Sequence, residues 1–97
     1  MTLTELRYIV AVARERHFGR AAETSFVSQP TLSVGIRKIE EELGVALFER
    51  GSGEVTITAF WALIVEQAQR VLDQVHGICV LARQGQDPLR GPLRIGV

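Results

Sequence analysis

The stretch from residue 28 to residue 44 carries the start and stop signals of a single helix. Ser28 is a favourable N-cap, because its hydroxyl can accept a hydrogen bond from a free backbone N–H one turn into the helix. Pro30 lies in the first turn, where its missing N–H is not needed, and Gly44 can adopt the left-handed conformation that ends a helix. We therefore predict a helix that runs to Leu43. Its apolar side chains fall on one face, at Leu32, Ile36, Ile39 and Leu43.

Two helices are predicted before this one, the second of them shorter. Thr2 and Glu5 have the spacing of a capping box, which starts a helix within residues 2–17. The apolar face of that helix is formed by Leu3, Leu6, Val10 and Ala13. A second helix begins near Gly19, and its Ala21 and Ala22 are small enough to let another helix approach closely. This order is typical of a helix-turn-helix, although a small helical bundle would use the same spacing for packing alone.

The outward face of the third helix has the chemistry of a DNA-reading surface. A glutamine can hydrogen-bond to base edges, proline and valine can contact a thymine methyl group, and serine can reach a base or a phosphate. No acidic side chain occurs on this helix before Glu40, so its N-terminal half can enter a major groove. The residues on this face and its flank are Gln29, Pro30, Ser33, Val34 and Arg37.

The distribution of charge is more informative than its total. The formal net charge of the 97 residues is zero, whereas nucleic-acid-binding domains are usually basic. Residues 14–38 nevertheless carry five basic side chains against two acidic ones, and three glutamates follow at positions 40–42. Phosphates repel these glutamates, so the charge gradient would determine which end of the helix enters the groove. The alternative is that the glutamates form an ordinary solvated helix end.

A hairpin is predicted after the third helix. The runs "ALFER" and "EVTIT" are short and rich in β-branched and apolar residues, and "GSG" lies between them. Arg50, at the base of this wing, can lie along phosphates or enter a minor groove. The alternative is a surface arginine on a hairpin with no role in binding.

A long helix capped by Thr58 is predicted to follow the wing. Its apolar residues alternate at spacings of three and four over three heptad repeats, with Leu72 beside them. Such a seam needs more covering surface than a small winged domain supplies, so we expect a second copy of the chain as partner. The expected dimerisation residues are Trp61, Ile64, Ala68, Val71, Leu72, Val75 and Ile78. Cys79 lies beside the seam and is expected to be a buried structural thiol.

The motifs "SQPTLS", "IEEELG" and "LFER" together resemble the N-terminal region of LysR-type transcriptional regulators, and the resemblance covers essentially the whole chain. The segments "HFGRAA" and "VSQPTLSVGIRKIEEELGV" are similar to the peroxide-responsive OxyR branch. The resemblance implies a mainly α fold with a winged helix-turn-helix (1–58), a linker helix for dimerisation (59–86), and a hinge that opens an absent regulatory domain (87–97). It also implies a bacterial regulator that binds an interrupted palindromic operator in double-stranded DNA.

The resemblance further implies which residues contact DNA. These are Ser28, Gln29, Pro30, Thr31, Ser33 and Arg37 on the recognition helix, Arg50 on the wing, and Arg20 as a phosphate contact. Val34 departs from the polar residue that is common in relatives, so the base preference of relatives cannot be transferred. "TAFW" at residues 58–61 replaces the usual "TPAG", so the start of the linker helix and its packing on the winged domain cannot be transferred from relatives.

Several classes of partner and activity are not expected. A single cysteine and the lack of a secretory signal fit a reducing cytoplasm, and no apolar run approaches the roughly 20 residues that span a membrane. No metal or cofactor is expected in this region, and His17 and His76 lack the partners of a catalytic site, so an enzyme is not expected. The expected assembly is a homodimer, with a tetramer and RNA polymerase left open for a full-length protein. The rival interpretation is a protein-interaction module with a winged-helix scaffold that binds no DNA.

Overall fold

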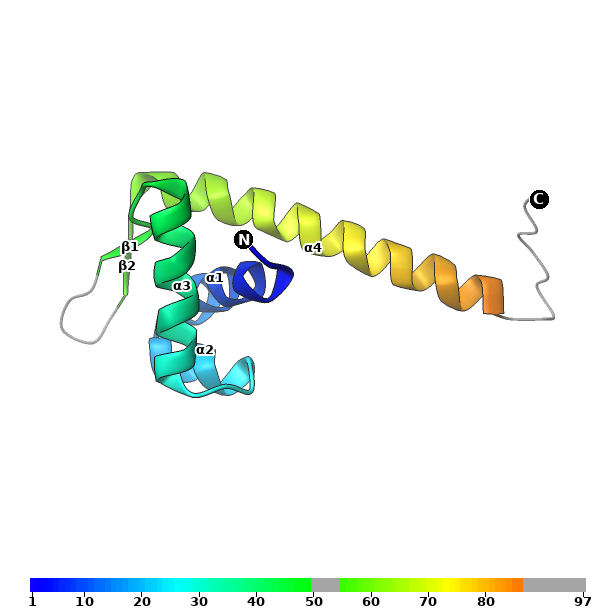
Figure 1. Ribbon diagram of the computed structural model, residues 1–97, viewed down its shortest axis with the longest axis horizontal. Coiled ribbons are helices and arrows are strands. Elements are labelled where there is room, and N and C mark those ends of the chain that lie inside the picture. Colours follow the sequence, from blue (N-terminus) through cyan, green and yellow to red (C-terminus); the bar gives the residue numbers. More distant parts are fainter. Residues whose placement is uncertain (50–54, 87–97) are drawn as a thin grey trace.

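The computed structural model describes residues 1–49 and 55–86, and within them the chain is mainly helical. The elements are α1 (Leu3–Glu15), α2 (Phe18–Thr24), α3 (Gln29–Leu43), β1 (Phe48–Glu49), β2 (Thr56–Ile57) and α4 (Ala59–Gln86). The two strands pair antiparallel, with Phe48 opposite Ile57. Figure 1 shows a compact domain from which α4 projects at one side. The predicted fold class is confirmed, while the "GSG" turn and Arg50 lie outside the described residues.

The helix ends form where the local sequence places them. Thr2 Oγ1 accepts from the Glu5 N–H at 3.1 Å, and Glu5 Oε1 accepts from the Thr2 N–H at 3.1 Å, so the predicted capping box is confirmed. Ser28 Oγ accepts from the Thr31 N–H at 3.3 Å at the start of α3. That helix ends at Gly44, whose φ of 73° lies in the left-handed region, as predicted.

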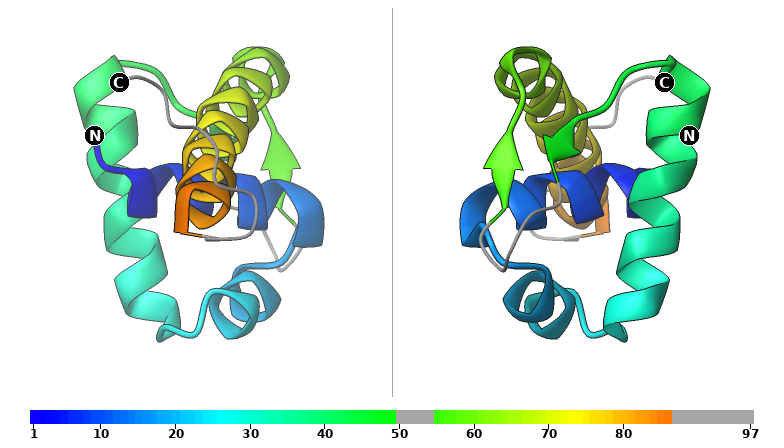
Figure 2. Two further views of the ribbon diagram at one scale, coloured as in Figure 1. Left: turned by 90° about the vertical axis from the view of Figure 1, so that its right-hand side faces the viewer. Right: turned by 90° about the vertical axis from the view of Figure 1, so that its left-hand side faces the viewer.

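Helix α1 forms the centre of the domain, and it packs against α2, α3 and α4. Figure 2 shows it crossing the domain, with α3 upright at one side. Because neighbours cover α1 from several directions, its buried arc is wider than one amphipathic stripe. Tyr8, Ile9 and Val12 are therefore buried together with the predicted Leu6 and Val10. The expectation for Leu3 was wrong, since this side chain at the end of the helix is 39% exposed.

Helix α3 packs on α1 where Gly35 lies directly against the ring of Tyr8. A Cβ on Gly35 would lie 2.6 Å from Tyr8 Cδ2, so only a glycine fits against that ring without a shift. The predicted apolar face is buried at Leu32, Ile36 and Ile39, while Leu43 at the end of the helix remains exposed. Ala21 and Ala22 on α2 are buried, as their small size predicted.

The first half of α4 belongs to the core of the domain. Trp61 is 9% exposed and Ala68 2% exposed, and both lie in the apolar cluster formed with α1 and β1. The Trp61 ring meets the Phe48 ring edge to face, with the centroids 6.0 Å apart. The Thr58 hydroxyl, predicted as a helix cap, donates to the Ala46 carbonyl at 2.9 Å and so ties the start of α4 to the loop after α3.

The predicted seam of α4 is therefore divided between two faces. Trp61 and Ala68 are buried in the apolar core of their own chain, so they are not available as a dimer surface as expected, and Ile64 and Leu72 pack partly against the same core. Val75 is half-buried, whereas Val71 and Ile78 are exposed. The solvent-facing apolar side of α4, which we call the outer stripe, consists of Phe60, Leu63, Val71, Ile78 and Leu81. Cys79 is exposed, so the expectation of a buried thiol was wrong.

Candidate nucleic-acid interface

The N-terminal ends of α2 and α3 lie close together. His17 caps α2, because its Nδ1 accepts from the Arg20 N–H at 3.1 Å, and the helix starts at Phe18, near Gly19 as predicted. A Cβ on Gly19 would lie 2.9 Å from His17 Cε1 and 3.8 Å from Gln29 Oε1. Gly19 thus makes room for the capping ring and places the start of α2 against the first residue of α3. This cap was not predicted from the sequence, because histidine is not one of the residues usually preferred at a helix N-cap.

The predicted DNA contacts in the described residues are accessible to a partner. Val34, for example, is 54% exposed although it is a large apolar side chain on a packed helix. Ser33 is half-buried. The exposed members of the set are Arg20, Ser28, Gln29, Pro30, Thr31, Val34 and Arg37. Arg50, the remaining predicted contact, lies outside the described residues.

Two of these side chains are linked to each other. Ser28 Oγ and Thr31 Oγ1 lie 2.9 Å apart in a hydrogen bond, while Ser28 Oγ also accepts the capping N–H of Thr31. This pair fixes the first turn of α3, from which Gln29 and Pro30 project into solvent. Ser28 is therefore already committed to shaping the helix start, whatever further contact its hydroxyl makes.

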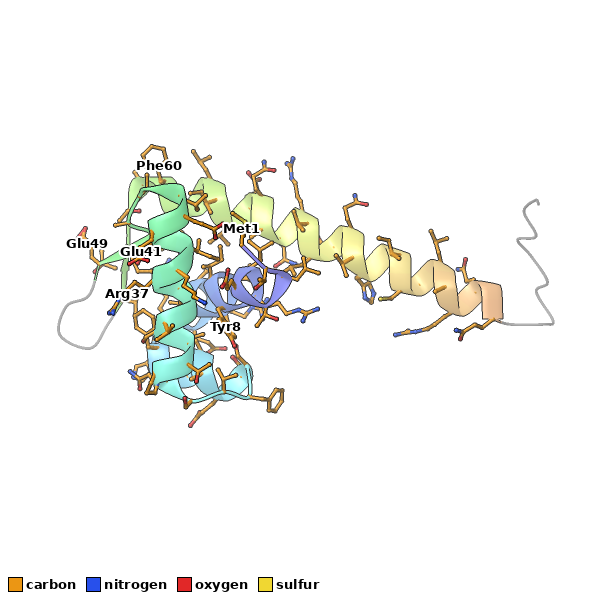
Figure 3. The ribbon with its side chains drawn as sticks, viewed as in Figure 1. Met1, Tyr8, Arg37, Glu41, Glu49 and Phe60 are labelled. Atoms are coloured by element: carbon orange, nitrogen blue, oxygen red, sulfur yellow. The ribbon has the colours of Figure 1, made fainter. Side chains whose placement is uncertain are left out.

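The side of α3 that faces the hairpin carries charge of both signs. Figure 3 shows Arg37 and, one turn later, Glu41 extending from α3 toward the side on which the hairpin lies. Both are exposed, as is Glu49 on β1. The basic side chain is the one nearer the N-terminal half of the helix, so the charge gradient predicted from the sequence is present on this surface.

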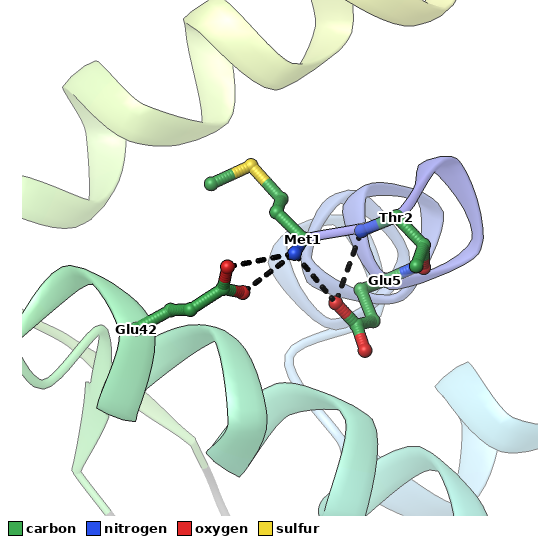
Figure 4. A network of polar contacts seen from close by, with 4 residues as sticks. All are labelled: Met1, Thr2, Glu5 and Glu42. Atoms are coloured by element: carbon green, nitrogen blue, oxygen red, sulfur yellow. Dashed lines mark hydrogen bonds and ion pairs between the residues drawn. The ribbon is translucent and has the colours of Figure 1, made fainter.

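Two of the three consecutive glutamates have partners within the chain. Glu40 Oε2 accepts from the Leu47 N–H at 2.8 Å and from the Phe48 N–H at 3.2 Å. Glu42 Oε1 lies 2.7 Å from the Met1 α-amino nitrogen, which also lies 3.9 Å from Glu5 Oε1 (Figure 4). The hydrogen bond to Glu42 raises the pKa of this amino group above 8.0. The sequence alone indicates one acidic block, whereas the fold gives Glu40 and Glu42 separate partners.

Two kinds of structural feature are absent from the described part of the chain. None of its helices has the length and apolar character needed to cross a membrane. Across residues 1–49 and 55–86, no three histidine, cysteine or acidic side chains gather as a metal site.

Known proteins share both the sequence and the fold. The chain is 50% identical over all its 97 residues to a hydrogen peroxide-inducible genes activator of Pectobacterium carotovorum, but it spans only 32% of that relative. A full-length OxyR variant from Pseudomonas aeruginosa is 62% identical, with a TM-score of 0.81, covering 84% of this chain and 28% of that one.

A third similar protein is a DNA-binding domain whose structure was solved in complex with DNA. The BenM domain bound to catB site 1 DNA is 37% identical, with a TM-score of 0.84, covering 90% of this chain and 97% of that one. Residues 3–60 match the family described as bacterial regulatory helix-turn-helix proteins of the lysR family. Because that match covers more than half of the sequence, the chain belongs to the LysR family of bacterial helix-turn-helix regulatory proteins.

Proposed function

We propose that this chain is the sequence-specific DNA-binding and dimerisation region of a LysR-type transcriptional regulator. The observation that carries the proposal is the exposed N-terminal half of α3, which presents Gln29, Pro30 and Val34 between two exposed arginines, Arg20 and Arg37. The likeness to a BenM domain solved with DNA supports this use of the same fold. The recognition helix enters the major groove and the wing, with Arg50, contacts the backbone or minor groove.

The mode of binding follows from the chemistry of this surface. Arginines supply affinity through phosphates without reading sequence, while the side chains of the first turns of α3 discriminate between base pairs. In this proposal residues 1–58 bind DNA and residues 59–86 form the dimer contact. Residues 87–97 form a hinge toward a regulatory domain. The apolar packing of Trp61 on the winged domain couples the first two units mechanically.

The proposed assembly is a homodimer on an interrupted palindrome. The outer stripe of α4 exposes large apolar side chains, with Ile78 at 66% and Leu81 at 61%, and a second α4 would cover them. Two copies related by a two-fold axis would present two recognition helices to two half-sites. A full-length protein extends this scheme to a tetramer.

The proposed signal is peroxide, because the similar curated relatives carry that function in their names. The chain spans about a third of their length, so sensing would reside in residues outside this region. Cys79 is not proposed as the sensor, because sensing is assigned to residues outside this region. RNA polymerase is the proposed further partner of a full-length regulator in the bacterial cytoplasm.

The proposal is tested by selecting duplexes from a randomised DNA library and titrating the chain with the enriched sequence. We expect affinity to fall steeply with salt concentration, by a slope of about 0.9 per phosphate contact. Arg37→Ala should weaken binding and lower that slope by about 1. Arg70→Ala is the matched control, because Arg70 is an exposed arginine on α4 paired with Glu66 at 3.9 Å. No enrichment, or an affinity insensitive to salt, would favour the protein-interaction module instead.

Base reading is tested separately with Gln29→Ala. We expect this variant to lose about 1–3 kcal/mol of discrimination at one base pair while it retains its phosphate contacts. The measurement is a panel of operator duplexes with single base-pair changes. An unchanged pattern of preference across the panel would remove Gln29 from the set of base readers.

A further inference from the structure

The carboxylate of Glu40 joins the recognition helix to the wing. It lies one turn after Arg37 on α3, and its Oε2 accepts hydrogen bonds from two consecutive backbone N–H groups, those of Leu47 at 2.8 Å and Phe48 at 3.2 Å. The backbone carbonyl of the same residue accepts from the Gly44 N–H at 2.8 Å. One residue therefore holds both ends of the connection between α3 and β1.

The residues held by this carboxylate are anchored on their other side as well. Leu47 is fully buried and Phe48 is 4% exposed, and the Phe48 ring packs edge to face against Phe18 and Trp61. The Leu47 carbonyl accepts from the Thr58 N–H at 3.2 Å, which fixes the returning strand. The apolar core thus holds the side chains of Leu47 and Phe48, while the Glu40 carboxylate ties their backbone to α3.

We propose that Glu40 is a positioning residue for DNA binding, which sets the wing relative to the recognition helix. The inference rests on the proposed DNA-binding function. A charged acceptor that receives two N–H groups makes stronger hydrogen bonds than a neutral one, so it limits how far β1 can move from α3. Glu40 thereby holds β1, the described strand at the base of the wing, at a fixed position relative to Arg37 on α3.

Whether removing Glu40 weakens or strengthens DNA binding distinguishes a positioning role from simple repulsion of the phosphates. A glutamate that merely adds negative charge near DNA weakens binding, so its removal should strengthen binding or leave it unchanged. Glu41 provides the matched control, because it is the neighbouring exposed glutamate on the same helix. We expect Glu41→Ala to bind the selected duplex as tightly as the unmodified chain or more tightly, and Glu40→Ala to bind on the order of tenfold more weakly despite losing a negative charge.

Two conservative variants test the geometry at Glu40. Glu40→Asp keeps the charge but shortens the side chain by one methylene, so we expect weakened binding. Glu40→Gln keeps an acceptor oxygen at the same reach but loses the charge that strengthens both hydrogen bonds, so we expect a smaller loss of affinity than in the Ala and Asp variants. The amide proton shifts of Leu47 and Phe48, measured by NMR without DNA, should move most in the Ala and Asp variants and less in the Gln variant.

A double-mutant cycle with Arg50→Ala connects the effect to the wing. If Glu40 acts by positioning the wing, the losses from Glu40→Asp and Arg50→Ala should be less than additive, and each single variant should lower the salt slope by about 1. Additive losses, or unchanged affinity in Glu40→Asp with an intact circular dichroism spectrum, would overturn the inference. Failure of the unmodified chain to bind any selected duplex would instead overturn the proposed DNA-binding function.

Discussion

Gly35 on α3 lies directly against the Tyr8 ring of α1, so its substitution has a large predicted effect on stability. The Cβ of an alanine there would meet the Tyr8 ring at 2.6 Å, and the ring is buried and cannot move aside freely. We expect Gly35→Ala to lower the free energy of unfolding by about 1–3 kcal/mol, as overpacked core substitutions do. Urea denaturation at a fixed protein concentration measures this loss.

At Gly77 in α4, the same change from glycine to alanine is expected to have the opposite effect on stability. A Cβ at this position would meet no atom within 4 Å, so alanine adds helix propensity without a clash. We expect Gly77→Ala to raise stability by up to about 1 kcal/mol in the same urea experiment. If both alanine variants shifted the unfolding midpoint in the same direction, the close approach of Gly35 to Tyr8 would not control the packing of α3.

Single positions also show how far sequence reasoning reaches. The caps at Thr2, Ser28 and Gly44 were predictable because each cap and its partner lie within four residues of one another. The partners of Glu40 and Glu42 lie seven or more residues away, and only the folded arrangement brings them together. Phe26 had no local signal either: it is 93% exposed and adopts a φ of 59°, which non-glycine residues rarely do.

The N-terminus of α1 is tied to the C-terminal end of α3 by an ion pair that depends on pH. The hydrogen bond with Glu42 raises the pKa of the Met1 α-amino group above 8.0 in the folded chain. A raised pKa means that the pair stabilises the folded state fully below about pH 8, and that this contribution is lost as the pH rises through the raised value. Above that value the amino group is neutral in both states.

We expect Glu42→Gln to return the pKa of the amino group toward 8.0. The measurement is an NMR titration of Met1, on protein whose mass shows that this methionine is retained. Glu41→Gln is the control with the same change of charge one residue away, and it should leave the titration almost unchanged. Equal shifts in both variants would mean that general electrostatics, rather than the contact with Glu42, sets this pKa.

The helices themselves were predictable, but the faces they bury were predicted less well. Periodicity gave the apolar face of α3 almost completely, because α3 packs on the domain through one side. It failed for α4, where the heptad spacing joined residues that face α1 with residues that face solvent. Trp61 and Ala68 lie on the first side and Ile78 on the second. A spacing of three and four shows that a helix is amphipathic, but it does not distinguish an intrachain partner from a second copy.

The projecting α4 is the element through which the proposed dimer would form. The extents of the molecule are 55 × 25 × 18 Å, and the long dimension reflects a helix that runs well past the domain it starts from. Beyond Leu72, this helix carries exposed Ile78 and Leu81 with no covering element among the described residues. A second α4 packed along the outer stripe would remove these side chains from water and place two winged domains at opposite ends of the pair.

Ile78→Glu tests this assembly together with DNA binding. A glutamate in an apolar helix–helix contact would have to be buried unpaired, so we expect dimer dissociation to increase at least about 100-fold. His76→Glu is the control: it places the same charge on α4 about 200° around the helix from position 78, at an exposed site away from the outer stripe. Analytical ultracentrifugation should find Ile78→Glu monomeric at micromolar concentration and His76→Glu dimeric.

The same pair of variants links assembly to the operator. Two tethered winged domains bind two half-sites with an avidity that separate domains lack, so Ile78→Glu should lose affinity for a palindromic duplex while it retains the affinity of one domain for a half-site. His76→Glu should bind both duplexes like the unmodified chain. A dimeric Ile78→Glu would show that the two copies meet elsewhere. A monomeric Ile78→Glu with full affinity for the palindrome would show that DNA, rather than the outer stripe, holds the two domains in register.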